Sequence, residues 1–290
     1  KDKMEDAFQG LDQQSLFTPI TKKTWTVKSS KIIPNIMSDA FNLAMKPRRG
    51  PVCVNLPRNI LAAKNNYNIN TNKPSFYSES SLKGKDENIK KSAKIINQAK
   101  QFVIIAGGGI KYTAKYREVI KLAELLNAPI VTAAGHGDAI PFNHKLNAGQ
   151  MGPRGNPVAS RLVKEADVIL AIGTRLGFNS TFYSYDNINK KAKIIQIEIE
   201  KKMLGKYFPV VLGINADAAT ATNQIYNEIK KQKIKLDIKS WTNTFIKERK
   251  NYLINRENND LGKNFPIQPK GLFKQLRKAL PKDTAITLDA

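Results

Sequence analysis

Short runs of apolar, mostly β-branched residues recur along the middle of the chain, and amphipathic segments separate them. The runs occupy residues 102–106, 129–132, 168–172, 193–199 and 210–214. An unbroken apolar run of this length is typical of a strand that is buried on both faces of a parallel sheet. Between the first two runs, segment 113–127 carries Val119, Ala123 and Leu126 at helical spacing. This alternation predicts an α/β fold with a doubly wound parallel sheet.

Residues that favour the N-terminus of a helix precede the other helical segments of this region. They are Asp86, Asn156 with Pro157, and Asp217. The first helix is predicted to bury Ile89, Ala93 and Ile96, the second to span 158–166, and the third to end at Ile229. The intervening segment 133–156 shows neither period, so it is predicted to be a long loop, which is more often functional than decorative.

The chain before this region has a weaker pattern. Residues 17–27 mix β-branched and aromatic residues with a proline, which predicts extended chain with one strand. A helix begins near Ile33 and ends at Pro47, and a buried strand is predicted at 52–56. These elements form the last α-β unit of a domain.

The chain after this region contains a helix with Trp241, Phe245 and Tyr252 on one face. Such a face predicts docking on the rest of the protein in preference to ligand contacts. A helix at 269–280 and a strand at 285–288 are expected to follow.

The patterns predict a division into two partial domains around a complete one. The segments are 1–62, the linker 63–84, the central domain 85–235, the linker 236–268, and the start of a further domain at 269–290. Because Lys1 is not an initiator methionine, we interpret the sequence as an internal piece of a longer protein.

Composition restricts the class of protein. Hydrophobic residues make up 41% of the chain and charged residues 25%, as in an ordinary globular protein. No apolar run approaches the roughly 20 residues of a membrane helix, and no signal peptide is recognisable. The single cysteine, Cys53, lies in an apolar strand pattern, which predicts a buried, inert thiol. A cytoplasmic protein without a membrane partner is expected.

The net charge of +24 raises the question of nucleic-acid binding. Lysines such as Lys90, Lys91 and Lys94 lie on the predicted polar faces of helices, and aromatic and basic residues do not interleave as they do where bases stack. We therefore expect no nucleic-acid partner. The excess charge favours small anionic ligands.

Candidate binding residues follow the predicted strands. They are Gly107, Gly108, Gly109, Thr132, Gly173, Thr174, Arg175, Glu198 and Asp217. The carboxyl ends of parallel strands meet at one edge of a sheet, so these residues are predicted to surround one nucleotide-binding crevice. Arg175 can pair with phosphates in bidentate geometry. Glu198 can accept hydrogen bonds from ribose hydroxyls, or it can be a solvent-exposed residue at the end of a strand. The glycine triplet fits a nucleotide loop and a tight turn equally, because G-x-G-x-x-G is absent.

The two histidines, His136 and His144, have no neighbouring cluster of cysteine or carboxylate residues. Metal binding is therefore not expected, and hydrogen bonds within the loop are the predicted role of both side chains.

Several segments in order resemble one enzyme family. They are Asp6-Ala7-Phe8-Gln9 with Ile20-Thr21-Lys22, Arg49-Gly50-Pro51-Val52 through Leu56-Pro57-Arg58, Ala106 to Gly109, Pro129 to Thr132, Gly149-Gln150-Met151-Gly152, Ile172-Gly173-Thr174-Arg175, and Ala192 to Ile195 with Glu198 and Asp217. This series resembles thiamine diphosphate (ThDP)-dependent enzymes of the acetolactate synthase-like family.

The resemblance implies a central domain of DHS-like nucleotide-binding fold between partial pyrimidine-binding and diphosphate-binding domains. It implies ThDP and Mg²⁺ as cofactors, a homodimer or homotetramer, and a carboligase or acyltransferase acting on pyruvate or a related 2-oxo acid or aldehyde. Gln9 and Lys22 match positions that line the family's substrate channel. The family's activating glutamate would precede Lys1 and its Gly-Asp-Gly…Asn motif would follow Ala290, so the chain alone is predicted to be inactive.

Two departures leave alternatives open. FAD-binding members often carry Arg-Phe-Asp-Asp-Arg where this chain has residues 175–179, so FAD stays open. The loop reads Gly152-Pro153-Arg154-Gly155, where acetolactate synthases tend to have Met-His. The loop resembles that of neighbouring branches of the family, and sulfoacetaldehyde acetyltransferase is the alternative enzyme. Arg154 is the candidate residue for binding a sulfonate or a phosphate. A free-standing nucleotide- or flavin-binding module is the alternative of another class, and a nucleic-acid binder is the least favoured.

Overall fold

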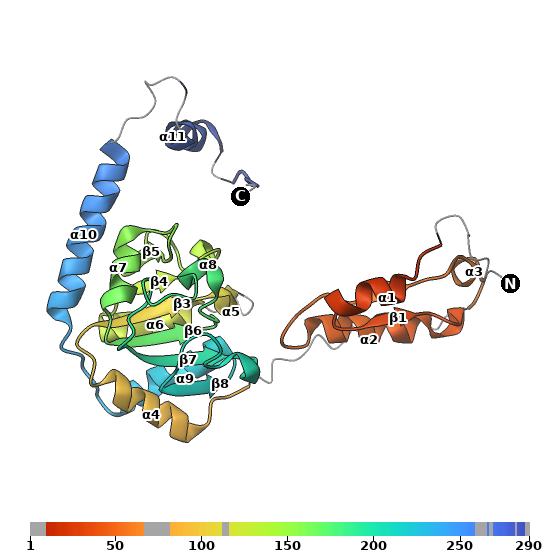
Figure 1. The fold of residues 1–290 in the computed structure, drawn as a ribbon, viewed down its shortest axis with the longest axis horizontal. Coiled ribbons are helices and arrows are strands. Elements are labelled where there is room, and N and C mark those ends of the chain that lie inside the picture. Colours follow the sequence, from red (N-terminus) through yellow and green to blue (C-terminus); the bar gives the residue numbers. More distant parts are fainter. Residues whose placement is uncertain are drawn as a thin grey trace.

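The computed structural model describes residues 10–66, 82–111, 116–258, 266, 269–281 and 283–287. Two units are visible in Figure 1, a larger one built around a six-stranded sheet and a smaller one built around a pair of strands. The larger unit comprises residues 82–258 and the smaller one residues 10–66, apart from the undescribed positions.

The sheet of the larger unit is parallel throughout. Its strands are β3 (Phe102–Ala106), β4 (Ile130–Thr132), β5 (Asn147–Gln150), β6 (Val168–Ile172), β7 (Lys193–Glu198) and β8 (Leu212–Asn215), in the order β5-β4-β3-β6-β7-β8. The chain therefore runs from the centre to one edge, returns, and then runs to the other edge. This confirms the doubly wound fold, whose switch point lies between β3 and β6, where Phe102 pairs with Val168 and Ala106 with Ile172.

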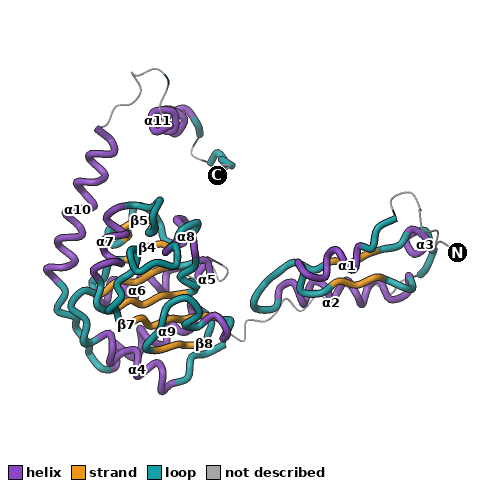
Figure 2. Tube along the Cα trace, viewed as in Figure 1, coloured by secondary structure: helices purple, strands orange, loops and turns teal. Residues whose placement is uncertain are grey.

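Helices cover the sheet so that β3 and β6 are buried along their whole length. The helices are α4 (Asp86–Ile96), α5 (Gly108–Lys111), α6 (Tyr116–Leu126), α7 (Pro157–Glu165), α8 (Phe178–Thr181), α9 (Ala218–Lys231) and α10 (Lys239–Asn258). Helix α9 contacts α4 and α6, whereas α10 contacts α7. Figure 2 shows the helices arranged around the strands. The expected helix caps are also present, because the side chains of Asn156 and Asp217 accept backbone N–H bonds at the starts of α7 and α9.

Helix α10 docks on the larger unit as its aromatic face predicted. The side chain of Phe245 is fully buried, and Trp241 is 7% exposed. The Trp241 indole N–H donates to the carbonyl of Phe102 at 3.0 Å, and the Thr242 hydroxyl donates to that of Asn127 at 2.6 Å. Beyond it, α11 covers Pro269–Ala279, close to the predicted helix.

The smaller unit contains a strand-helix-strand motif. Its elements are α1 (Gln13–Phe17), η1 (Thr18–Ile20), β1 (Thr24–Thr26), η2 (Ser30–Ile32), α2 (Ile33–Met45), β2 (Cys53–Asn55) and α3 (Arg58–Leu61). Strands β1 and β2 are parallel, with Thr24 opposite Cys53. The predicted α-β unit is therefore present, but neither strand has a fully buried residue.

Four expectations are wrong. The long loop at 133–156 contains strand β5, whose residues Asn147–Gln150 pair with β4 although they form no apolar run. Residues 17–20 are helical, not extended, and no strand occurs at 285–287; Leu288 lies outside the described residues. Cys53 is only partly buried because β2 lies in the thinly covered smaller unit.

Candidate functional site

A cleft of about 1060 Å³ opens at the carboxyl ends of β3, β6 and β7. Seven of its lining residues were predicted from the sequence: Gly108, Gly109, Gly173, Thr174, Arg175, Glu198 and Asp217. Further lining residues come from the smaller unit, at the end of α2 and just beyond it, and include Met45, Arg48 and Arg49. The structure thus brings most of the predicted residues to one place.

The glycines let the ends of β3 and β6 touch. The Gly107 N–H donates to Ile172 O and the Gly109 N–H to Gly173 O, both at 2.9 Å. A Cβ at Gly107 would lie 2.4 Å from Gly173 O, and Gly173 itself has a φ of +59°. The close approach of the two strand ends therefore accounts for Gly107, which is not among the cleft-lining residues. Gly108 lies under the ring of His136, where a Cβ would be 2.7 Å from Cε1.

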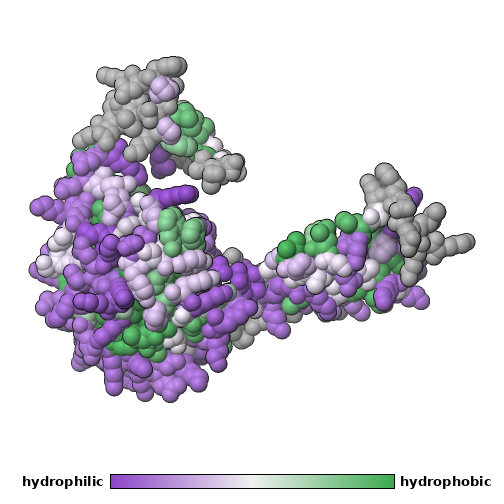
Figure 3. Space-filling model, viewed as in Figure 1, coloured by the Kyte–Doolittle hydropathy of each residue, from purple (hydrophilic) through white to green (hydrophobic). Residues whose placement is uncertain are grey.

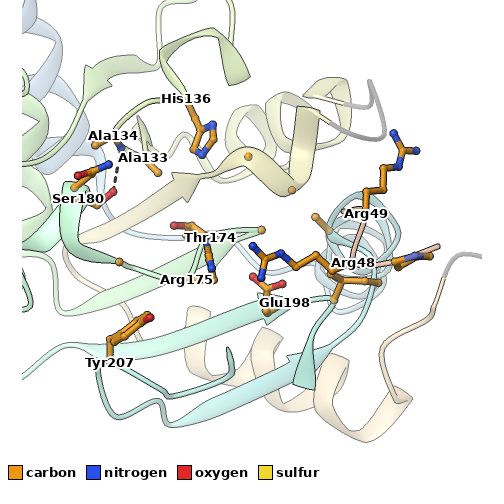
Figure 4. Close-up of a pocket in the computed structure, with 18 of the residues that line it drawn as sticks. Arg48, Arg49, Ala133, Ala134, His136, Thr174, Arg175, Ser180, Glu198 and Tyr207 are labelled. Atoms are coloured by element: carbon orange, nitrogen blue, oxygen red, sulfur yellow. Dashed lines mark hydrogen bonds between the residues drawn. The ribbon is translucent and has the colours of Figure 1, made fainter. Parts of the chain in front are cut away.

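Glu198 is an almost buried carboxyl group, 8% exposed, at the end of β7. Burial raises its pKa, and this exceeds the lowering by backbone hydrogen bonds and by the charge of Arg175. The Glu200 N–H donates to its Oε1 at 3.3 Å. Figure 4 shows Glu198 in the cleft with the side chains of Arg48 and Arg175 near it. The site thus combines the carboxyl group of Glu198, which burial makes harder to ionise, with the positive charges of Arg48 and Arg175.

Arg48 also connects the two units directly. Its Nη1 lies 3.5 Å from Glu200 Oε2 in an ion pair between α2's C-terminal loop and the turn after β7. The Glu200 carboxylate pairs with Lys202 at 2.8 Å as well. Hydrogen bonding to Lys202 is the main reason that the pKa of Glu200 is lowered, and Arg48 contributes.

Two buried polar atoms near the cleft have no hydrogen-bond partner among the described residues: Thr132 Oγ1 and His136 Nδ1. Burial lowers the pKa of His136, and the nearby Lys111 adds to this effect. An ion pair of 2.8 Å between Lys111 and Asp138 joins α5 to the loop that carries the histidine. His136 lines the cleft, whereas Thr132 does not.

His144 makes the loop hydrogen bonds expected of it. Its Nδ1 accepts from the Leu146 N–H at 3.3 Å, and its Nε2 lies 3.3 Å from Glu124 Oε1. In the described part of the chain, no group of three or more His, Cys, Asp or Glu residues is arranged to hold a metal ion. No described helix has the length and apolar character needed to cross a membrane.

Two of the predicted substrate-channel residues, Lys22 and Arg154, are not among the cleft-lining residues. The Lys22 ammonium donates to the carbonyls of Lys46 at 2.8 Å and Arg48 at 3.0 Å, so it stabilises the C-terminal end of α2. Arg154 is exposed at the tip of a turn closed by the Gly155 N–H on Gly152 O. Gln9 lies outside the described residues.

Sequence reasoning missed the aromatic wall of the cleft, which consists of Phe178, Tyr183 and Tyr207. The signal was present in part, because the segment 178–185 contains Phe178, Phe182, Tyr183 and Tyr185. Nothing in that segment pointed to Tyr207, which comes from the turn after β7.

The sequence is similar to a known enzyme family and to several curated proteins. Residues 89–225 match the family described as "Thiamine pyrophosphate enzyme, central domain". The chain is 30% identical to a probable acetolactate synthase large subunit of Methanococcus aeolicus, with 98% of this chain and 49% of the relative covered. It is 32% identical to the acetolactate synthase large subunit of Buchnera aphidicola subsp. Schizaphis graminum, with the same coverage.

A sulfoacetaldehyde acetyltransferase of Castellaniella defragrans is 28% identical, with 97% of this chain and 50% of the relative covered. The chain thus spans about half the length of the curated relatives that it matches. The match runs through both units, and the six-stranded parallel sheet lies where the central-domain family matches. Residues 89–225 are therefore the central domain of a thiamine pyrophosphate enzyme, and nearly the whole chain is similar to acetolactate synthase large subunits.

Proposed function

We propose that the protein acts as a ThDP-dependent carboligase or acyltransferase on pyruvate or a related 2-oxo acid or aldehyde. The observation that carries this proposal is the similarity over nearly the whole chain to acetolactate synthase large subunits. When bound, ThDP supplies a carbanion-stabilising electron sink. The described residues of this chain contribute the central domain. We expect the residues that hold ThDP and Mg²⁺ to lie outside the described residues.

Acetolactate formation from pyruvate by the protein encoded by the complete gene, with ThDP and Mg²⁺ added, tests this activity. Acetolactate production that stops when ThDP is omitted is the expected result. A protein that binds nucleotides but converts neither pyruvate nor an aldehyde under these conditions would favour the alternative of a nucleotide- or flavin-binding module.

The second candidate activity is that of a sulfoacetaldehyde acetyltransferase, which the name of the Castellaniella relative favours. Such an enzyme would handle a sulfonate and a phosphate, and the exposed Arg154 offers a planar pair of N–H donors for either oxyanion. The assay is acetyl phosphate formed from sulfoacetaldehyde, compared with acetolactate formed from pyruvate. If Arg154→Ala leaves acetyl phosphate formation unchanged, Arg154 has no role in it.

We further propose that the cleft of the central domain binds a nucleotide. The arrangement of Arg175 and the buried Glu198 supports this, because a guanidinium pairs with phosphate oxygens and a carboxyl group accepts ribose hydroxyls. Further support comes from the sheet: Arg175 follows β6, one of the two strands at the switch point, and Glu198 ends the neighbouring strand β7. Doubly wound α/β proteins bind ligands at the switch point.

Titration of the protein with ADP, followed by calorimetry, tests nucleotide binding. Arg175→Ala is expected to weaken binding at least about tenfold, because a hydrogen bond to a charged group contributes roughly 1.5–3 kcal/mol. Lys94→Ala, on the exposed face of α4, is the matched control. Absence of ADP binding, or equal affinity in both variants, would contradict the proposal.

FAD is the other ligand to be tested in this cleft, by flavin absorbance of the purified protein.

We also propose a homodimer or homotetramer in the cytoplasm, with no nucleic-acid partner. Light scattering at several protein concentrations measures the assembly state directly.

A further inference from the structure

Four aromatic rings form a continuous series at the mouth of the cleft. This aromatic stack consists of Phe182, Phe178, Tyr183 and Tyr207. Phe178 stacks on Phe182 with ring centroids 4.8 Å apart, and Tyr183 stacks on Tyr207 at 4.7 Å. A tilted contact of 5.7 Å between Phe178 and Tyr183 joins the two pairs. Three of the four rings line the cleft, so the stack forms one of its walls.

The rings remain exposed although they contact each other. Phe178 is 54% exposed and Tyr183 is 50% exposed. Figure 3 shows an apolar patch within a largely polar surface at the position of α8 in Figure 1. Scattered single apolar residues on a surface require no explanation, but a contiguous group at a cleft is typical of a binding surface.

The backbone that presents the stack is strained. Phe182 has a φ of 47° and Tyr183 a φ of 54°, so two consecutive bulky residues adopt the left-handed conformation. Each such residue costs on the order of 1–2 kcal/mol relative to a right-handed conformation. The Phe182 N–H donates to Phe178 O at 2.7 Å, and the Tyr183 N–H to Thr181 Oγ1 at 3.1 Å. These bonds hold the rings in an arrangement that the backbone alone disfavours, as is found at functional sites.

The stack is connected to the charged part of the cleft. The Ala134 N–H donates to Ser180 Oγ at 3.0 Å and so ties α8 to the loop of His136 (Figure 4). Lys206 lies over the Tyr207 ring, with Nζ 5.4 Å from its centroid. A ligand in the cleft therefore meets aromatic faces at one wall and the cationic and acceptor groups of Arg175 and Glu198 at another.

We propose that the planar base of a nucleotide packs on this aromatic stack, and that Tyr183 is the residue that determines selectivity for ligands with a base. The inference rests on the proposed binding of a nucleotide in the same cleft. An aromatic face suits any planar base, because stacking needs a π-face and no particular pattern of hydrogen-bond donors. The phosphates of the same ligand reach Arg175. The base and the phosphates thus contribute separately to affinity.

The test compares ligands with and without a base. Calorimetry measures the affinities of ADP and of inorganic pyrophosphate for the wild-type protein and for Tyr183→Ala, Tyr183→Phe and Arg175→Ala. Tyr183→Ala is expected to weaken ADP binding about tenfold or more and to leave pyrophosphate binding unchanged. Tyr183→Phe, which keeps the ring, retains ADP affinity. Arg175→Ala weakens both ligands.

The matched control is Tyr185→Ala. Tyr185 is 41% exposed and lies in the same segment, but it contacts Phe208 edge-on and is not among the cleft-lining residues. This variant is expected to bind ADP as the wild type does. Circular dichroism of each variant establishes that the loop change has not unfolded the protein.

The outcomes separate the inference from the proposed function. If the wild type binds ADP and Tyr183→Ala binds it equally well, the inference is wrong and nucleotide binding stands. If Tyr183→Ala loses ADP and pyrophosphate to the same extent while folded, Tyr183 shapes the loop and does not bind a base. If the wild type binds pyrophosphate as tightly as ADP, the base makes no contact. If it binds neither ligand, the proposed nucleotide site falls and the inference falls with it.

Discussion

The two units share the same local design, a strand, a helix and a parallel strand, but they bury it to very different extents. Strands β3 and β6 are buried at all five positions each. Strands β1 and β2 have no buried residue. Helix α6 buries Val119, Leu122, Ala123 and Leu126, whereas α2 buries Ala40 alone and leaves Phe41 57% exposed.

This difference shows that a hydrophobic pattern becomes a core only when enough layers surround it. The described residues of the larger unit form six strands with helices packed on them, so its apolar residues are removed from water on both faces. The described residues of the smaller unit form two strands, and most of their apolar side chains keep part of their contact with solvent. We therefore expect the larger unit to dominate the stability of this 290-residue chain, and substitutions among residues 10–66 to cost this chain less.

Truncating an apolar strand residue in each unit gives the largest contrast. Phe102→Ala deletes a fully buried ring from β3 and is expected to destabilise the fold by about 3–5 kcal/mol. Val54→Ala removes a partly buried side chain from β2 and is expected to cost less than about 1 kcal/mol. Urea unfolding followed by circular dichroism measures both. Similar losses would show that the smaller unit has a core of its own.

Adding a methyl group to a glycine of each unit tests packing in the opposite direction. At Gly107 a Cβ would lie 2.4 Å from the Gly173 carbonyl oxygen, so Gly107→Ala is expected to destabilise by about 1–3 kcal/mol. At Gly50 the nearest atom would be Cδ of the Lys22 side chain at 3.1 Å, a contact that a shift of a few tenths of an ångström in an exposed side chain relieves. Gly50→Ala is therefore expected to change stability by less than about 0.5 kcal/mol. Thermal unfolding distinguishes the two, and a tolerated Gly107→Ala would refute the close approach of the two loops.

The N-terminal caps of one helix in each unit predict a smaller contrast. Asp217 accepts the Thr220 N–H at 2.9 Å and caps α9, a helix with six buried residues. Asp217→Ala is expected to cost about 1 kcal/mol. Asp12 caps α1 through the Ser15 N–H, but α1 has no buried residue, so Asp12→Ala is expected to change global unfolding by no more than a few tenths of a kcal/mol. Equal effects on the midpoint of urea unfolding would contradict this.

The smallest effects concern two carboxyl groups with opposite pKa changes. Burial raises the pKa of Glu198, so between the unfolded and folded values the folded state holds more protons and stability falls as pH rises. Glu198→Gln is expected to raise the melting temperature at neutral pH. This gain should shrink as the pH falls through the raised pKa of Glu198 and be absent below the ordinary carboxyl value of about 4.3.

Glu200 behaves in the opposite way because Lys202 and Arg48 lower its pKa. Its stabilising effect is present above the unfolded pKa and is lost as pH falls through the folded value. Glu200→Gln should therefore lower the melting temperature slightly at neutral pH and have no effect in acid. Arg48→Met, made in the smaller unit, should reproduce part of that loss if the ion pair connects the units in solution. An unchanged melting temperature in both variants would show that it does not.

Features that depend on residues close together in the sequence were predicted correctly, whereas features that depend on distant residues were missed. The runs that became β3 and β6 were recognised because continuous apolar residues are a local signal of a buried strand. Strand β5 was missed because Asn147–Gln150 carries no such signal and owes its conformation to pairing with β4. The helix caps at Asn156 and Asp217 were predictable, since a cap needs only a side chain three residues or fewer from the N–H that it accepts.

The candidate site shows the same division. Arg175 and Glu198 were expected near each other because strand ends converge in any doubly wound sheet. The aromatic stack was not expected, because Tyr207 lies far from Tyr183 in sequence and meets it only when β6 and β7 pair side by side. Lys22 was predicted to line a substrate channel, and only the tertiary structure shows that its ammonium group donates to the carbonyls at the end of α2.

The sequence by itself therefore determined the parallel sheet, its helices, their caps and the edge of the sheet where charged side chains collect, because these depend on periodicities and short-range hydrogen bonds. Only the tertiary structure decided which apolar residues form a core, why Gly107 must lack a side chain, and which rings and charges share the cleft. Those features depend on contacts between residues distant in the chain. Such contacts arise from the order of the strands in the sheet, and no local sequence pattern predicts them.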